Sequence, residues 1–412
     1  MMRQINCVNL ERQVNMQSFT QHSPTEVVFG RGTENQTAAL VKKYGGSKVL
    51  IVYGSGSVEH SGLLGNIEKQ LTEAGITFIK HGGAVPNPHL SHAREGVKKA
   101  IEAKVDAVLA IGGGSAIDAA KAIAHGAANP GIDIWKFWLR EENLTKSLPV
   151  GVILTISAAG SETSNSSVIT NTETAEKRGF LTDFNRPRFA IMNPEQTFTL
   201  PKDQLANGVA DIMMHTMERY FTSETVEGKP NEMTDEIAEG LLRVVIKNGT
   251  KILENPANYD AQSEIMWAGS LSHNGITGLG RTMDFSVHAL GHELSGKFDV
   301  AHGKSLTAMW GAWARHVKHI SIPRFAQYAR KVWGVTASDD NTAADEGIIA
   351  TEKYFNSIGM PINFTELGIG KQTDEILQDL AHRCVFYGAR KIGTFSPLEE
   401  SAVLEIYKAV NH

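Results

Sequence analysis

Continuous apolar runs alternate with helical patterns in the first half of the chain. Three runs are apolar almost throughout, at 48–53, 105–111 and 148–156. Such runs are typical of strands buried on both faces of a parallel sheet. Shorter strands are predicted at 26–30, 77–80 and 189–192. The helices predicted between strands are 62–74, 90–103 and 116–128. This alternation predicts a parallel, Rossmann-like sheet with helices on both faces.

The pattern changes after a hinge predicted at 194–201. Beyond it we expect no strand, because apolar residues recur three and four positions apart, as in helices that cover a core. The predicted helices are 204–221, 230–248, 257–278, 284–296, 304–320, 322–333, 342–357, 373–386 and 397–410. The last should begin with Ser396 as N-cap, Pro397 at the first helical position and Glu399 closing a capping box.

The two patterns divide the 412 residues into an N-terminal extension at 1–17, an α/β domain at 18–202 and an all-helical domain at 203–412. Domains of roughly 100–200 residues are the usual size. Ligands commonly bind at such a domain boundary, so the loops and side chains near residue 200 are the first candidates for a site.

Composition narrows the possible partners. A net charge of −5 without a basic run makes nucleic acid and an anionic membrane poor partners. No run approaches the ~20 apolar residues of a membrane span, and the first residues lack a secretory apolar core. The two cysteines, Cys7 and Cys384, cannot form a disulfide framework. We therefore expect a cytoplasmic protein.

A glycine-rich loop follows the predicted strand at 105–111. It consists of Gly112, Gly113, Gly114 and Ser115, and Asp118 lies one turn further on. Consecutive glycines let the backbone approach a pyrophosphate, and the next helix offers free N–H groups and the positive end of its dipole. A tight turn without a ligand is the alternative. The G-x-G-x-x-G spacing of standard dinucleotide folds is absent.

Two further loops follow predicted strands. The first contains Ser55, Gly56 and Ser57 and could lie against an adenosine ribose. It has no carboxylate to accept a free 2′-hydroxyl, which favours NADP(H), although its serines could merely tolerate a turn. The second loop is rich in hydroxyls, which could line a cofactor cleft or serve only the loop, and its candidates are Thr155, Ser161 and Ser164. Lys177 lies in a polar segment, where a solvated lysine is the ordinary interpretation.

Five residues with the chemistry of metal ligands lie in the second half. Asp211 and His215 are four apart, as are His288 and His292, and His302 follows a glycine-flanked break. Residues four apart share a helix face, and ligands from two helices can enclose one metal. A carboxylate with imidazoles suits Fe(II) or Zn(II). A catalytic metal keeps one position open, so at least one candidate is not a ligand, and spacing leaves open which.

Three motifs together resemble the iron-containing (group III) alcohol dehydrogenases. They are Gly112-Gly-Gly-Ser-Ala-Ile-Asp118, Asn207-Gly-Val-Ala-Asp-Ile-Met-Met-His215, and His288-Ala-Leu-Gly-His292 followed by His302. The resemblance covers about 18–410 and is closest to the branch of NADPH-dependent aldehyde reductases and butanol dehydrogenases. It implies a dehydroquinate synthase-like fold with the active site between an α/β and a helical domain, and a homodimer.

The resemblance also implies roles for individual residues. Asp211, His215, His288 and His302 match the metal ligands, whereas His292 matches a histidine near the nicotinamide that does not bind metal. His288 and His292 would thus be the catalytic residues. Cofactor contacts are implied for Ser55, Gly56, Ser57, Gly112, Gly113, Gly114, Ser115, Asp118, Thr155, Ser161, Ser164 and Lys177.

The implied reaction is reversible hydride transfer between NADP(H) and a primary aldehyde or alcohol of the butanol type. Apolar residues expected in the cleft are Trp267, Leu271, Met283 and Phe285. Three alternatives stay open on the same fold: an NAD-dependent polyol dehydrogenase, a lyase that uses NAD transiently, and a non-catalytic relative that binds metal or nucleotide.

Overall fold

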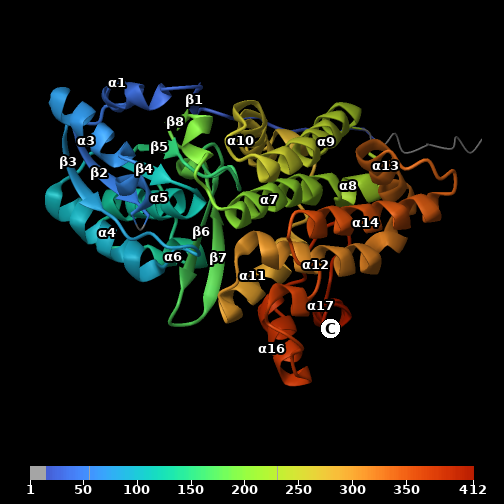
Figure 1. Cartoon of the computed structure of the whole chain (residues 1–412). Coiled ribbons are helices and arrows are strands. Elements are labelled where there is room, and N and C mark those ends of the chain that lie inside the picture. The colour runs from blue at the N-terminus through green and yellow to red at the C-terminus, as the bar shows by residue number, and fades with distance from the viewer. Residues whose placement is uncertain (1–14, 55, 230) are drawn as a thin grey trace, which may run out of the picture.

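A computed structural model describes residues 15–54, 56–229 and 231–412. Ser55, Cys7 and most of the predicted N-terminal extension lie outside the described residues. The first half forms a sheet with helices on both sides, and the second half forms a helical body beside it (Figure 1). This confirms the predicted fold class. No helix in the described ranges is both long and apolar enough to cross a bilayer.

The main sheet has six parallel strands in the order β1-β8-β5-β4-β2-β3. Their bounds are β1 (Glu26–Phe29), β2 (Lys48–Tyr53), β3 (Thr77–His81), β4 (Ala107–Gly112), β5 (Val150–Leu154) and β8 (Phe189–Met192). The chain passes from β2 to β3 on one side and then returns to β4 on the other. The order therefore reverses between β2 and β4, and ligands of open α/β sheets bind at such a reversal, beyond the carboxyl ends of the strands.

Alternate residues of the central strands face two separate apolar layers. Leu50 and Val52 pack with one set of helices, and Val49 and Ile51 pack with the other. The first set is α4 (Leu90–Ala103), α5 (Gly114–Ala128) and α6 (Trp135–Leu139). The second is α1 (Thr37–Lys43) and α3 (Leu63–Glu73), which follows the short α2 (Ser57–His60). Burial on both faces explains why β4 and β5 contain no exposed residue.

An antiparallel hairpin was missed by the sequence analysis. Its strands are β6 (Ser166–Asn171) and β7 (Glu176–Leu181), paired over their whole length. The outer strand β7 is polar and partly exposed, so its sequence resembles a loop. The hairpin extends from the sheet toward α11 and α16 (Figure 1). Arg383 of α16 donates to the Ala175 carbonyl at its tip and pairs with Glu293 at 3.1 Å.

Residues beyond 202 form helices around one large core. Their bounds are α7 (Lys202–Tyr220), α8 (Ser223–Val226), α9 (Glu232–Glu254), α10 (Tyr259–His273), α11 (Ser286–Phe298), α12 (His302–Val317), α13 (Ile322–Trp333), α14 (Asp340–Ser357), α15 (Phe364–Leu367), α16 (Asp374–Cys384) and α17 (Glu400–Ala409). Stacked and edge-to-face aromatic side chains such as Phe221, Phe325 and Trp313 fill the centre. The all-helical prediction is thus correct for this half, within the described residues.

The predicted start of the last helix is wrong. α17 begins at Glu400, with Glu399 as N-cap and no side-chain cap. The backbone of Leu398 pairs with Ile392 in an antiparallel bridge, with N···O distances of 2.8 and 3.1 Å. The residues before Glu399 are therefore extended, and the capping box predicted from Ser396 does not form. The helix predicted at 257–278 also ends early, at His273.

Glycines bring the loop after β5 directly onto the helical body. A Cβ atom at Gly208 of α7 would lie 2.1 Å from the Ser157 carbonyl oxygen. A Cβ at Gly160, whose φ is +66°, would lie 2.3 Å from the Gly269 carbonyl of α10. Only glycine permits this separation, because a backbone oxygen cannot swing aside as a side chain does. The loop after β5 is thereby held in contact with α7, the helix that contains Asp211.

We expect Gly208→Ala to destabilise the protein by about 1–3 kcal/mol, the usual cost of overpacking a buried position. The added methyl group must displace either α7 or the loop after β5. Thermal and urea unfolding midpoints would measure the effect. Gly65→Ala in α3 is the matched control, because nothing lies within 4 Å of its Cβ. Alanine should leave stability there unchanged or raise it by up to ~1 kcal/mol. Equal midpoint shifts in both variants would contradict the proposed clash.

Candidate metal and nucleotide site

Helix α7 presents three polar side chains on one buried face. Asp211, His215 and Glu218 follow each other at intervals of four and three residues, the spacing of one helix side. Each is 5% exposed or less, although most of the other buried side chains of the helix are apolar. Burial of two carboxylates and an imidazole costs free energy unless they are paired or bind an ion. This face of α7 is therefore the foundation of a candidate site.

Three imidazoles surround the Asp211 carboxylate. Its Oδ1 atom lies 3.4 Å from His215 Nε2, 3.8 Å from His288 Nε2 and 3.7 Å from His302 Nε2. The potential donor atoms of Asp211, His215 and His288 all lie within 4.8 Å of one another. The fourth member, His302, begins α12 and keeps about a quarter of its side chain exposed. α11 and α12 thus bring their histidines to the helix that carries Asp211.

Glu218 fixes the orientation of His288. One carboxylate oxygen accepts the backbone N–H groups of Val287 and His288, at 2.7 and 3.1 Å, and so caps the first turn of α11. The other oxygen bonds to His288 Nδ1. With a proton on Nδ1, the lone pair of Nε2 faces Asp211. A carboxylate behind a ligating histidine is a common support in metal sites.

The donor set fits one divalent transition metal. Asp211 Oδ1 and His288 Nε2 are both buried and have no hydrogen-bond partner among the described residues. Two such atoms aimed at one point are costly unless a cation lies between them. One carboxylate oxygen and up to three imidazole nitrogens suit Fe(II) or Zn(II) better than Mg(II), which prefers oxygen ligands.

Burial and neighbouring charges favour the neutral form of two of the three imidazoles around Asp211. Burial lowers the pKa of His215 and His302 well below the usual value, and the neighbouring positive groups lower it further. Burial opposes the charged form of His288 too, but Glu218 and Asp211 outweigh it and raise its pKa to about 9. In the metal-free protein His288 therefore carries a second proton, on Nε2, and metal binding must release that proton.

His292 lies beside this cluster. Its ring centre is 6.0 Å from that of His288 and 5.4 Å from that of His302. Burial, followed by the charges of Lys177 and His288, lowers the pKa of His292 well below its usual value. The residue is outside the group of donor atoms around Asp211 Oδ1. The structure thus places it where a neutral imidazole can meet a ligand at the edge of the site.

The two glycine loops lie next to each other at the β2–β4 reversal. Tyr53 is opposite Ile111 in the sheet, so the loops that follow these strands are neighbours. Among the residues that the structure describes, no side chain caps the start of helix α5 at Gly114, so its first N–H groups have no side-chain partner there. A Cβ at Gly113 would come within 2.9 Å of Ile156, so glycine is needed there. A pyrophosphate fits this helix end.

The side chains of Asp118 and Ser161 form hydrogen bonds with other residues of the protein. Asp118 accepts hydrogen bonds from Ser161 Oγ at 2.6 Å and from the Val168 N–H at 2.8 Å. The buried Lys121 donates to Ser161 Oγ at 2.9 Å and to the Ser161 and Ser166 carbonyls at 2.8 and 2.7 Å. Burial lowers the pKa of Lys121 to about 8, although Asp118 opposes this. This network ties α5 to the loop of Ser161 and Ser164 and to the hairpin. Direct cofactor contacts of Asp118, Ser161, Ser164 and Thr155 stay predictions.

Lys177 is not the solvated lysine that its polar surroundings suggested. It lies on β7, is half-buried, and donates to Asn87 Oδ1 at 2.9 Å. Burial lowers its pKa to about 8, although Asp211, Asp118 and Asp299 favour the charged form. Asn87 also donates to Asp299 Oδ1 at 3.2 Å, which joins the loop after β3 to the helical body. The missed hairpin explains the error, because it folds this residue toward the site.

Other site residues were missed or only partly predicted. Phe285 packs against the rings of His215 and His288, with centres 5.6 and 4.8 Å apart, as expected for a cleft residue. Arg219 and His273 were not predicted: Arg219 donates to His273 Nδ1 at 2.9 Å, and the His273 ring lies 4.0 Å from that of His215. The remaining apolar candidates include two surface-exposed residues, Trp267 at 42% and Met283 at 39%.

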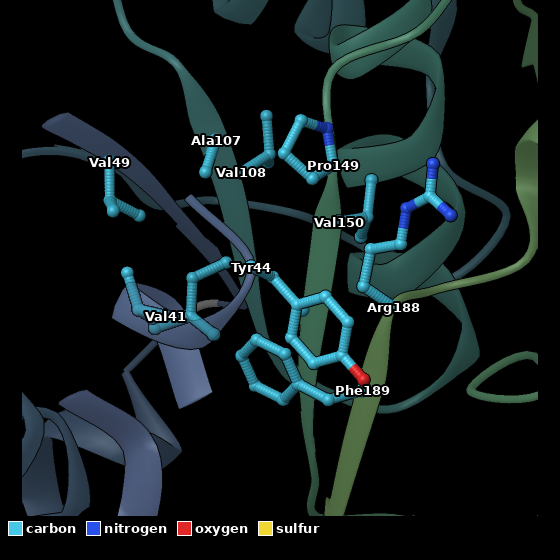
Figure 2. A pocket seen from close by; sticks show the side chains of 11 residues that line it. Val41, Tyr44, Val49, Ala107, Val108, Pro149, Val150, Arg188 and Phe189 are labelled. Carbon is cyan, nitrogen blue, oxygen red and sulfur yellow. The ribbon is translucent and has the colours of Figure 1, made fainter. Parts of the chain in front are cut away.

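A small apolar pocket lies at the other end of the sheet, near the amino ends of its strands (Figure 2). It is lined by residues at the starts of strands and by α1, including Val49, Ala107, Pro149, Phe189 and Tyr44. The carboxyl ends of the same strands carry the glycine loops. This pocket is therefore separate from the nucleotide and metal site.

Two family models match the chain. The model described as iron-containing alcohol dehydrogenase matches residues 24–194, and the C-terminal model of the Fe-containing alcohol dehydrogenase family matches residues 205–411. NADH-dependent butanol dehydrogenase A of Clostridium acetobutylicum is 41% identical over 95% of this chain and 99% of its own. NADPH-dependent aldehyde reductase YqhD of Escherichia coli is 34% identical over 96% of this chain and 100% of its own.

A solved structure of similar shape is NADH-dependent butanol dehydrogenase A from Thermotoga maritima. It superposes with a TM-score of 0.91 at 33% identity, over 97% of this chain and 100% of its own. The similarity covers both the sheet and the helical body, so their mutual arrangement is shared.

We expect His288→Ala and His302→Ala to lose bound metal and activity together, because each removes an imidazole next to Asp211. His292→Ala should keep the metal and lose mainly turnover. Elemental analysis of the purified variants, together with steady-state rates, would separate the two outcomes. Loss of metal from His292→Ala would place His292 among the ligands.

Glu218→Gln should weaken metal binding by about 10–100-fold, the usual effect of removing the partner of a ligating histidine. The amide keeps the shape but carries no charge to hold the Nδ1 proton of His288. Competition with a chromophoric chelator would measure the affinity. The exposed Glu254→Gln at the end of α9 is the control for loss of one negative charge. An unchanged affinity in Glu218→Gln would contradict the orienting role.

Proposed function

The chain belongs to the iron-containing alcohol dehydrogenase family and is a metal-dependent alcohol dehydrogenase or aldehyde reductase, and we propose that it interconverts butanal-type primary aldehydes and alcohols with NADP(H). The main support for this proposal is the buried cluster around Asp211. Its unpaired donor atoms lie near the place where the loop after β5 contacts α7.

We assign the metal to Asp211, His215, His288 and His302, with Fe(II) and Zn(II) both compatible with these ligands. When bound, the metal supplies Lewis acidity toward a carbonyl oxygen and the nicotinamide carries the hydride. Asp211 offsets part of the positive charge, and Glu218 holds His288 in the tautomer that leaves Nε2 free. Phe285 covers the rings of His215 and His288 and limits access of water.

His292 is proposed to move the proton. A neutral imidazole accepts a proton during alcohol oxidation and returns it during aldehyde reduction. Its low pKa in the buried site disfavours a lasting imidazolium, so the proton must pass onward to solvent. Lys177 lies close enough to lower that pKa and is a further candidate contact for the cofactor. Gly112, Gly113, Gly114 and Ser115 are assigned to the pyrophosphate.

The preference for the phosphorylated cofactor rests on the loop of Gly56 and Ser57, which itself contains no carboxylate. The named relatives include both NADH-dependent and NADPH-dependent proteins, so the form of the cofactor is a finer proposal than the reaction. We also propose a cytoplasmic homodimer. Its support is the edge position of β1, which among the described residues pairs with β8 alone, and its exposed Phe29.

The proposed function predicts that metal-loaded protein oxidises NADPH when butanal is added. The test is NADPH and NADH oxidation over a series of aldehydes, on protein whose metal has been measured, with the reverse reaction assayed on butanol and glycerol. Faster turnover with glycerol than with butanol would favour a polyol dehydrogenase. Binding of metal and NADPH without turnover of any substrate would favour a non-catalytic relative.

A further inference from the structure

The adenosine end of the cofactor can be located from the fold. In the strand order, β4 lies between β5 and β2. The loop at its carboxyl end, 112–115, is the one assigned to the pyrophosphate. The loop after β5 lies on α7 and α10 and so leads to the metal cluster. A dinucleotide whose nicotinamide points to that cluster must direct its adenosine toward β2 and β3. This step rests on the proposed function.

A carboxylate stands at that end, although the loop itself has none. Glu59, in the first turn of α2, accepts a hydrogen bond from Tyr53 Oη at 2.9 Å. Its Oε2 atom lies 3.9 Å from the position of a Cβ on Gly56, and the ring of His60 lies 3.5 Å from the same point. Tyr53 is the last residue of β2, and its ring packs against Gly82 after β3. A buried phenol therefore holds the carboxylate beside the glycine loop.

No cation among the described residues lies within ion-pair distance of Glu59. The nearby Lys80 is paired with Glu68 at 3.0 Å. The Nδ1 atom of His60 contacts the Gly56 carbonyl at 2.7 Å, which occupies that nitrogen. Glu59 is exposed, so its field acts through solvent and is weakened by salt.

We propose that Glu59 determines how strongly this enzyme discriminates between NADP(H) and NAD(H). The 2′-phosphate carries nearly two negative charges, whereas the 2′-hydroxyl of NAD(H) is neutral and can donate to a carboxylate. Ser57 and the glycine backbone leave room for the phosphate, and Glu59 repels it. Glu59 therefore weakens the preference for NADPH that the carboxylate-free loop favours, and removal of the Glu59 charge shifts the protein further toward NADPH.

The test is Glu59→Gln and Glu59→Lys, each compared with wild type for both cofactors. Dissociation constants come from fluorescence titration of NADPH and NADH without aldehyde, and kcat/KM comes from butanal reduction. Glu59→Gln should raise the NADPH-to-NADH ratio of both quantities about fivefold, the size expected for one charge several ångströms away through solvent. Glu59→Lys should raise it further. Added salt should raise the ratio in wild type and change it less in Glu59→Gln.

Glu73→Gln is the matched control, because it removes the charge of another exposed glutamate, at the far end of α3. It should leave the ratio unchanged. An unchanged ratio in Glu59→Gln, or an equal change in Glu73→Gln, would overturn the assignment while wild type still reduces butanal. Failure of wild type to bind either nucleotide would instead overturn both the assignment and the proposed function.

Discussion

The buried carboxylate of Asp211 is the constraint on which the rest of the structure depends. It lies among three imidazoles beside a large apolar core of the helical half. Such a group is tolerable only when a cation completes it, since an unpaired buried charge is strongly destabilising. The surrounding helices are arranged accordingly. His288 in the first turn of α11 and His302 at the start of α12 both reach α7, and Glu218 of α7 accepts hydrogen bonds from the first turn of α11.

The cofactor side is fixed to the same helix by close backbone contact. The Ser157 carbonyl lies where a side chain on Gly208 would be, and Gly160 of the same loop makes a similar contact with Gly269 of α10. A hydride can pass only between atoms that are held close together, so small errors in this spacing are costly. Glycines at the junction allow the sheet and the helical body to share one site without a layer of side chains between them.

Charge is distributed unevenly along the path that we propose for the dinucleotide. The helix N-terminus of α5 and the half-buried Lys177 favour phosphate near the centre of the cleft. In the proposed assignment the adenosine end combines small hydroxyl residues with the Glu59 carboxylate, and these favour different cofactors. The reaction and the choice of cofactor would then depend on groups at opposite ends of the site that do not touch.

The sequence by itself determined the parallel α/β half, the helical half, both glycine loops and the five candidate ligands, because strand and helix periods and i, i+4 spacings are local properties. The family resemblance then divided the histidines into roles. Only the tertiary structure could show that Glu218 supports His288, since 70 positions separate them. It also revealed the hairpin that partly buries Lys177 and the bridge that displaces the start of α17. Each of these depends on which surfaces meet after folding, and no local pattern encodes that.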